Sequence, residues 1–103
     1  MSHVTDIILV TGICDDGPFD THPNVDLLSQ KAGFKLEKVD KYAGGDKAMQ
    51  CSIFLASINY LDIEQFTVLF RSIPWENPEM VQLFLKDEDE KVFVEIKLNQ
   101  FPE

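Results

Sequence analysis

Residues 15–20, Asp-Asp-Gly-Pro-Phe-Asp, are the first stretch whose side chains have the chemistry of a binding site. They bring together three carboxylates, and Pro18 stiffens the chain between them. A calcium ion takes about six to eight oxygen ligands, and the spacing here does not match that of an EF-hand loop. We therefore predict no metal site. A solvated loop and an acidic contact surface for a basic protein both remain open for this segment.

Residues 44–47, Gly-Gly-Asp-Lys, contain the glycines and the lysine of a phosphate-binding loop, but not its full pattern. A P-loop needs a longer glycine-spaced segment and a helix directly after it. Here a strand is expected next, and the carboxylate of Asp46 repels a phosphate group. The segment is therefore predicted to be a turn between two strands.

The thiols and imidazoles are not arranged for nucleophilic catalysis. A reactive thiolate requires electropositive surroundings, whereas Cys14 is followed directly by two aspartates and Cys51 opens an apolar run. His3 and His22 have no cysteine or serine partner that the sequence places beside them. General acid–base catalysis by two paired carboxylates remains an open interpretation, but no such pair falls on an apolar face. The sequence therefore favours a protein that is not an enzyme, with no catalytic residue and no cofactor.

Two aromatic residues and their polar neighbours form the last candidate cluster. Tyr60, together with Asn59, ends an apolar run, and Trp75, together with Glu76, follows the second expected helix. Tyrosine and tryptophan are frequent anchors of protein interfaces, and they also cap the cores of small domains. Both interpretations remain open for these residues.

Five strands and two helices are needed to position these residues. Apolar runs and alternating patterns predict strands over residues 4–13, 34–42, 49–60, 80–86 and 92–98. The strands over 4–13 and 49–60 are apolar on both faces, which is typical of central strands in a covered sheet. In residues 34–42 the apolar alternation breaks near Glu37 and Lys38, which indicates a bulge or an edge position, and the lysines are typical of an edge strand. Phe84 and Phe93 are expected to form a cross-strand pair in the final hairpin.

The two helices are indicated by their apolar spacing and by their end signals. The first has a proline in its first turn and a glycine after its last, and Thr21 or Asn24 is its expected cap. The second is expected to be capped by Asp62, with Gln65 in a capping box, and to end before Pro74.

The order of these elements predicts an α+β fold, built as a two-layer sandwich. We expect the ferredoxin-like βαββαβ arrangement, an antiparallel sheet with two helices on one face, with an added strand from a C-terminal hairpin. In that arrangement the first and third strands are adjacent in the middle of the sheet. A single domain is expected over residues 1–103, with 99–103 as a loose tail.

Charge is abundant and unevenly placed. Eighteen acids against nine lysines and arginines give a formal net charge of −9. Such a chain repels a phosphate backbone, so nucleic acid is not an expected partner. Residues 31–47 hold five lysines against three acids, whereas residues 87–90 are all acidic. Acidic surfaces attract basic proteins and speed their encounter.

These observations favour a non-catalytic acidic binding protein that docks on a basic protein partner, of the immunity or inhibitor type. The expected contact residues are Asp15, Asp16, Asp20, Tyr60, Trp75, Glu76, Asp87, Glu88 and Asp89. One alternative is a small-molecule sensor or regulatory domain that forms a homodimer through a sheet face or an edge strand. A further one is a small ferredoxin-like enzyme with a cavity lined by Tyr60, Asn59 and a histidine. Because no signal peptide or membrane-length apolar run is evident, we expect a cytoplasmic protein that binds no membrane.

Overall fold

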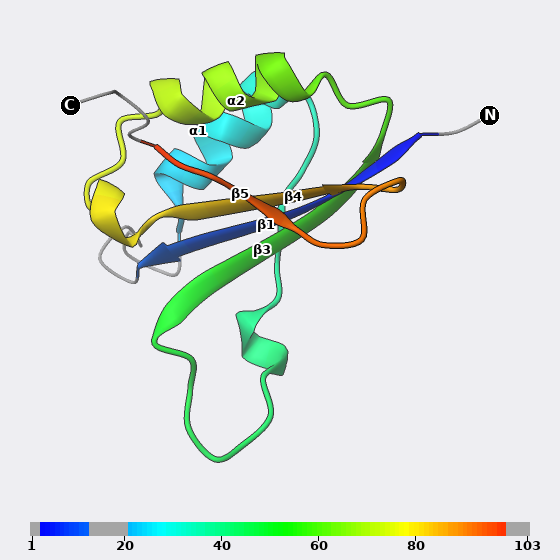
Figure 1. The fold of residues 1–103 in the computed structure, drawn as a ribbon. Coiled ribbons are helices and arrows are strands. Elements are labelled where there is room, and N and C mark those ends of the chain that lie inside the picture. The colour runs from blue at the N-terminus through cyan, green and yellow to red at the C-terminus, as the bar shows by residue number, and fades with distance from the viewer. Residues whose placement is uncertain (1–2, 13–20, 99–103) are drawn as a thin grey trace.

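The computed structural model describes residues 3–12 and 21–98, so the expected loose tail lies outside the described residues. The described residues form a five-stranded antiparallel sheet, two α-helices and two short 3-10 helices (Figure 1). The fold is of the α+β class, as the order of the elements predicts. In chain order, the elements are β1 (Val4–Gly12), α1 (Pro23–Ala32), β2 (Glu37–Lys38), η3 (Asp40–Tyr42), β3 (Cys51–Asn59), α2 (Ile63–Ser72), η4 (Pro78–Met80), β4 (Gln82–Asp87) and β5 (Val94–Ile96).

Strand β1 lies in the middle of the sheet, whose strand order is β2-β3-β1-β4-β5. It pairs in antiparallel orientation with β3 on one side and with β4 on the other. The register places Ile8 opposite Leu55 of β3 and opposite Phe84 of β4. The prediction that the first and third strands are adjacent is thus confirmed.

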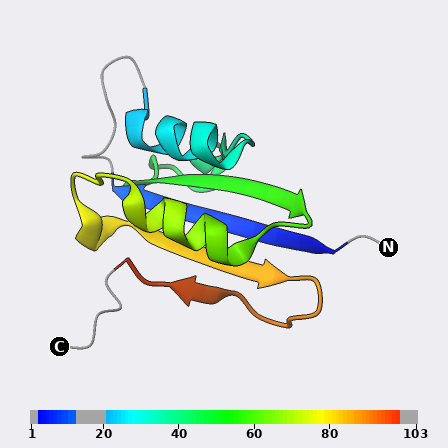
Figure 2. The ribbon, with the colours of Figure 1, turned by 90° about the horizontal axis from the view of Figure 1, so that it is seen from above.

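Both α-helices lie on the same side of the sheet, so the described residues build two layers (Figures 1 and 2). The layers meet through alternate strand residues, because successive side chains of a strand point to opposite faces. On β1, Ile7 and Leu9 are 1% and 0% exposed, while Ile8 between them is half-buried. The buried apolar residues of the described core are Ile7, Leu9, Val25, Leu28, Leu36, Phe54, Phe66, Phe70, Ile73, Trp75, Val81, Leu83 and Leu85.

The expectation of a covered sheet holds for one face only. In the described ranges, 3–12 and 21–98, no α-helix packs against the face that points away from α1 and α2 (Figure 1). On that face Leu55, in the middle of β3, is 40% exposed. We call this surface the open face.

Helix α2 begins and ends where the sequence predicts. The Asp62 carboxylate accepts a hydrogen bond from the Gln65 amide at 3.1 Å, which satisfies one of the free N–H groups in the first turn. The last helical residue is Ser72, ahead of Pro74. Because Asp62 also follows β3 after only two residues, the cap fixes the point where the chain turns from the sheet into the helical layer.

Helix α1 is capped differently from the expectation. His22 holds the cap position and makes no side-chain cap hydrogen bond, so the prediction of Thr21 or Asn24 as the cap is wrong. The Asn24 side-chain amide instead donates to the carbonyl oxygen of Pro74 at 3.2 Å and ties the start of α1 to the chain beyond α2. Gly33 ends the helix with a φ of 85°, the left-handed conformation that glycine adopts most easily.

The strand predicted over residues 34–42 is much shorter in the structure. Glu37–Lys38 pair with β3, and Asp40–Tyr42 form η3 instead. The carboxylate of Asp40 accepts the Ile53 amide at 3.1 Å, so a side chain occupies the place that a strand carbonyl takes in a longer ladder. The predicted length is wrong for this reason, while the predicted position at the edge of the sheet is confirmed.

The last hairpin also differs from its prediction. Strand β5 keeps three residues of the predicted span 92–98, and η4 occupies the chain directly ahead of β4. Phe84 lies opposite Glu95, so the predicted cross-strand pair with Phe93 is wrong. Phe93 precedes β5 by one residue, and the register turns its side chain to the same face as Phe84.

Candidate partner-binding site

One end of the sheet gathers acidic side chains from two segments that are far apart in the sequence. Strand β1 begins here while β3 and β4 end here, because the register pairs Val4 with Asn59 and Thr5 with Asp87. Helix α2 begins at the same end, directly after β3 (Figure 1). We use the name acidic end for Asp62, Glu64, Asp87, Glu88, Asp89 and Glu90.

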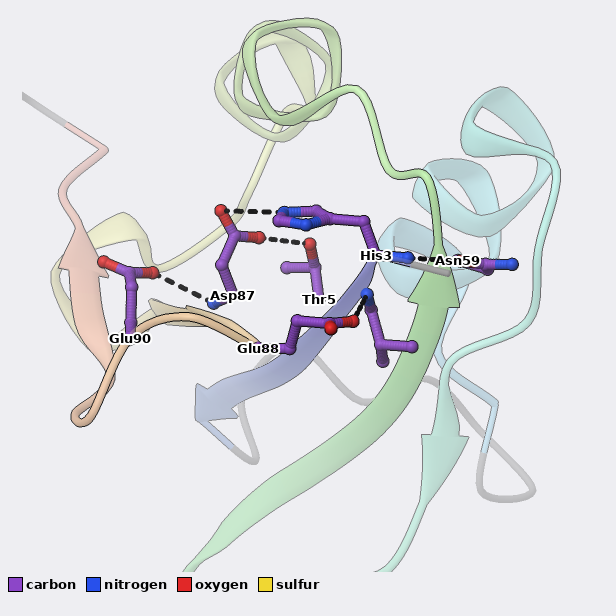
Figure 3. A network of polar contacts seen from close by, with 7 residues as sticks. His3, Thr5, Asn59, Asp87, Glu88 and Glu90 are labelled. Atoms are coloured by element: carbon purple, nitrogen blue, oxygen red, sulfur yellow. Dashed lines mark hydrogen bonds and ion pairs between the residues drawn. The ribbon is translucent and has the colours of Figure 1, made fainter. Parts of the chain in front are cut away.

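At the acidic end, Asp87 is held by two residues from the start of the chain (Figure 3). One carboxylate oxygen accepts a hydrogen bond from the hydroxyl of Thr5 at 2.5 Å, and Thr5 is 0% exposed. The other oxygen lies 3.6 Å from Nε2 of His3. Hydrogen bonds to an ionised group are stronger than neutral ones. Asp87 therefore fixes the beginning of β1 to the end of β4.

Glu88 and Glu90 complete the same network (Figure 3). The Glu88 carboxylate accepts the Val4 amide at 2.6 Å, and the Glu88 amide donates to the Val4 carbonyl at 2.9 Å. The Glu90 carboxylate accepts the Asp87 amide at 2.9 Å. These carboxylates satisfy amides at the point where strand pairing stops. Asp89 is exposed at the tip of the turn.

Tyr60 occupies a strained position beside this network. Its amide donates to the carbonyl oxygen of His3 at 2.8 Å, while the His3 amide donates to Oδ1 of Asn59 at 2.9 Å. Tyr60 has a φ of 60°, a left-handed conformation that costs a non-glycine residue about 1 kcal/mol. The turn leads the chain from β3 toward α2 and leaves the side chain of Tyr60 67% exposed.

A pocket of about 190 Å³ opens beside the acidic end, between the two α-helices and the end of β3. Most of its wall is apolar, and Asp62 and Gln65 supply polar groups. Such a lining suits one side chain or one compact molecule with an apolar body and a polar or cationic tip. The lining residues are Ala32, Phe34, Ile58, Tyr60, Leu61, Asp62, Gln65, Phe66 and Leu69.

The contact residues predicted from the sequence are brought together only in part. Tyr60 lies at the acidic end with the hairpin acids, whereas Trp75 and Glu76 follow the opposite end of α2. Trp75 is 8% exposed, and its indole Nε1 donates to the Phe70 carbonyl at 3.0 Å. Trp75 is thus a core residue, which corrects its assignment to the contact surface. The other predicted acids, Asp15, Asp16 and Asp20, lie outside the described residues.

Sequence reasoning missed the pocket and the part that Asp62 and Glu64 take in the acidic end. Asp62 was identifiable as a helix cap, but its distance of 25 residues from Asp87 conceals their common location. The signal that could have found it is the predicted adjacency of the first and third strands. That adjacency places the start of the second helix at the end of the sheet where the chain begins. The pocket lining contains neither Asn59 nor a histidine, so it lacks the groups that the enzyme alternative requires.

A second electrostatic feature, at the β2 edge of the sheet, is structural. Burial raises the pKa of the Asp40 carboxyl, but hydrogen bonds from the Ile53 amide at 3.1 Å and the Lys38 ammonium at 3.0 Å outweigh it. The pKa of Asp40 therefore lies below its ordinary value, and the group is ionised at neutral pH. Both carboxylate oxygens are engaged, so Asp40 holds η3 against β3.

Comparisons with known proteins provide no information on the function. No family model, no curated protein and no solved structure matches the chain. Among the residues described here, no group of three or more histidine, cysteine or acidic side chains is placed to hold a metal ion. No helix within those residues has the length and apolar character needed to cross a membrane.

Proposed function

We propose that this protein is a non-catalytic acidic binding protein that docks on a basic protein partner, of the immunity or inhibitor type. The observation that carries the proposal is the position of the acidic end beside an apolar pocket, with the exposed ring of Tyr60 at its rim. The predicted acids Asp15, Asp16 and Asp20 belong to the same proposal. So does a cytoplasmic setting, in which Cys51 stays a thiol.

A lysine or arginine side chain of the partner matches both parts of this site. Its aliphatic stem fills the apolar pocket while its charged head meets Asp62 or a carboxylate of the hairpin. The ring of Tyr60 offers a surface on which a guanidinium group stacks. Opposite charges also steer the encounter, so the association rate is expected to fall as the salt concentration rises.

The ferredoxin-like arrangement belongs to the proposal as well. Without β5, the strands follow the order β4-β1-β3-β2, and the two helices follow β1 and β3, as in the split βαβ motif. Strand β5 then adds one strand beside β4. Many unrelated activities occur on this arrangement, so the acidic end and its pocket, and not the fold, support the proposed function.

Affinity capture from an extract of the source cells at low salt, followed by mass spectrometry, tests the proposal. Glu64→Lys reverses an exposed charge of the acidic end, and Glu79→Lys makes the same change on η4, at the opposite end of β4. We expect the wild type and Glu79→Lys to enrich the same basic protein, and Glu64→Lys to lose it. With that protein purified, Glu64→Lys should weaken binding at least about tenfold, the effect of about 1.4 kcal/mol. Equal capture by the two variants, or enrichment of no basic protein by the wild type, contradicts the proposal.

A small-molecule sensor is the second candidate, and the same pocket favours it. At about 190 Å³ the pocket is small beside the range of roughly 300–1,000 Å³ for ligand sites, so the ligand has to be compact. Thermal-shift measurements with a panel of compact aliphatic and aromatic amines distinguish the two candidates. A sensor predicts an amine that raises the Tm of the wild type but not that of Ala32→Leu, which fills the pocket. If no amine shifts the Tm, the result contradicts the sensor and favours a pocket that receives a side chain of a protein partner.

A further inference from the structure

Apolar residues of three neighbouring strands form a continuous patch on the open face. The register aligns Leu55, Ile8 and Phe84 in one row across β3, β1 and β4. In the next row, Ile53 lies opposite Val10. With the phenylalanine that precedes β5, the open-face patch consists of Ile8, Val10, Ile53, Leu55, Phe84 and Phe93.

The open-face patch is accessible and hollowed. Leu55 and Phe93 are 40% and 39% exposed, and the other members are half-buried. A depression of about 260 Å³ lies between Phe93 and the middle of β1 and β3, and its wall includes Ile8, Asp6 and Ser57. The patch therefore offers both protruding apolar side chains and a hollow that receives one.

An open sheet face normally carries polar side chains. Strands packed on one side alternate apolar residues toward the core with polar residues toward water. Toward the acidic end this rule is kept, because Asp6 and Ser57 occupy the open face and the Ser57 hydroxyl donates to Asp6 at 2.7 Å. Over the patch the rule is broken on three strands at once. Contiguous exposed apolar surface of this kind marks an interaction site.

We propose that a second copy of this chain packs face to face on the open-face patch, so that the protein is a symmetric homodimer. Two such sheets pack about 10 Å apart with interdigitating side chains, and each copy fills the hollow of the other. The same residues of both copies meet in such a two-fold interface. This surface is separate from the acidic end, so the inference goes beyond the proposed docking function.

The charges of the open face favour a copy of the same chain over the basic partner. On the three central strands, Asp6 and Lys86 are turned to this face and lie opposite each other. On the outer strands the register also turns Glu37 and Glu95 to it, each in an ion pair with a lysine two residues away. The patch is thus neutral in a chain of net charge −9. Two copies of an acidic protein repel each other least where they meet through a neutral apolar surface. A basic partner is attracted to the acidic end instead.

The area of the open face reaches the lower end of what a specific dimer needs. The five strands hold 29 residues. At about 16 Å² for each residue in an antiparallel sheet, the whole sheet presents a flat face of about 460 Å² in each copy. Side-chain relief adds to this, so the two copies together bury on the order of 1,000 Å², the lower limit for specific interfaces. Interfaces of this size are typical of weak, reversible association, so we expect the dimer to be populated at high protein concentration.

The edges of the sheet are poorer sites for a second copy. Strands β2 and β5 have two and three residues, which is too short to pair with a strand of another chain over a useful length. The alternative of a dimer through the edge strand loses its basis, because most of residues 34–42 are not in the sheet. The open face is therefore the larger surface available to a second copy.

Sedimentation equilibrium over a range of protein concentrations tests the proposal. We expect the wild type to reach twice the chain mass of 11.8 kDa at high concentration. Leu55→Lys places a charge in the centre of the patch and should raise the dimer Kd by at least about 30-fold, as for a central interface residue. Val68→Lys is the matched control, because Val68 is 62% exposed on α2, in the other layer. It should leave the Kd within about threefold of the wild type.

Salt separates this interface from docking at the acidic end. Screening the net charge should strengthen the dimer as salt rises, whereas docking on a basic protein should weaken. If circular dichroism shows that Leu55→Lys is unfolded, Phe93→Ser replaces it, because Phe93 lies outside the strands. A wild type that stays at the chain mass throughout overturns the proposal. So does an equal change in Kd for the patch variant and Val68→Lys.

Discussion

The two faces of the sheet use the same strands and similar residues, yet they have different surroundings. On β1, Leu9 is 0% exposed beneath the helices, while Ile8 and Val10 on either side of it are half-buried on the open face. The covered face is buried by the helices of the same chain (Figure 1). The open face has an equally apolar centre and no second layer within the described residues. Apolar character in a strand therefore indicates that a surface becomes buried, but not which layer buries it.

The difference also separates two contributions to stability. Side chains on the covered face stabilise the folded monomer, and their effect does not depend on protein concentration. In the proposed homodimer, side chains of the open-face patch add stability that rises with protein concentration, because binding to the native state stabilises it. The two contributions can therefore be compared by substituting neighbouring residues of one strand and measuring the stability under the same conditions.

The largest expected effect comes from substituting Leu9 and Ile8 separately by alanine. Leu9→Ala should lower the free energy of unfolding by about 2–5 kcal/mol at any protein concentration, because it leaves a cavity in the core. Ile8→Ala should cost less than about 1.5 kcal/mol in dilute protein, and more at concentrations where the dimer is populated. Urea denaturation at two protein concentrations measures both. Equal costs for the two variants at low concentration would remove the distinction between the faces.

The sequence was sufficient for the parts of the fold that depend on local signals. The cap and end of α2, the left-handed Gly33 and the adjacency of β1 and β3 were all predictable, because each depends on residues close in sequence or on hydrophobic pattern. The length of β2 was not. The strand ends where the chain turns into η3 and the Asp40 carboxylate accepts a hydrogen bond from the Ile53 amide, and no pattern in residues 34–42 indicates that bond.

The candidate site was less predictable than the fold. The hairpin acids Asp87 and Glu88 were identified by their charge, but their hydrogen bonds to β1 depend on the pairing of distant strands. The sequence alone did not decide whether Trp75 is a core residue or an interface residue, because tryptophan is frequent in both settings. The pocket beside Tyr60 arises where three elements meet, and residue spacing along one element does not encode it.

A second comparison sets similar hydroxyl–carboxylate bonds on opposite faces. The Thr5 hydroxyl is buried and donates to Asp87, whereas the exposed Ser57 hydroxyl donates to Asp6 on the open face. Asp87→Ala should cost about 1–3 kcal/mol, because it leaves a buried hydroxyl without that acceptor. Ser57→Ala should cost less than about 0.5 kcal/mol, because water replaces the lost bond. Thermal unfolding measures both costs. A cost for Ser57→Ala as large as that for Asp87→Ala would contradict the comparison.

The pH dependence of stability tests the β2 edge of the sheet, where Asp40 holds η3 against β3. Asp40 has a lower pKa in the folded chain than its ordinary value of 3.8, so it stabilises the fold above that value. This contribution is lost as the pH falls through the folded pKa. Asp40→Asn should be about 1–2 kcal/mol less stable than the wild type at pH 7, because it removes a hydrogen bond to a charged group. In acid the two stability curves should converge.

The control for Asp40 is a carboxylate in an exposed ion pair. Glu37 lies 3.4 Å from Lys35, and both side chains are more than half exposed, at 67% and 80%. Glu37→Gln should change the stability by less than about 0.5 kcal/mol at every pH, because water screens such pairs. If the difference between wild type and Asp40→Asn were the same at pH 7 and in acid, the ionised carboxylate would not be the cause.

The smallest effect on stability is expected at Tyr60, the residue that directly follows β3. Glycine adopts a φ of 60° without steric cost, so Tyr60→Gly removes strain but gives the unfolded chain more freedom. The net change should be a stabilisation of at most about 1 kcal/mol. The same variant should weaken docking of a basic protein, because the ring at the rim of the pocket is lost. Tyr60→Phe keeps the ring and should dock normally. A clear loss of stability in Tyr60→Gly would instead show that the ring is a packing element of the fold.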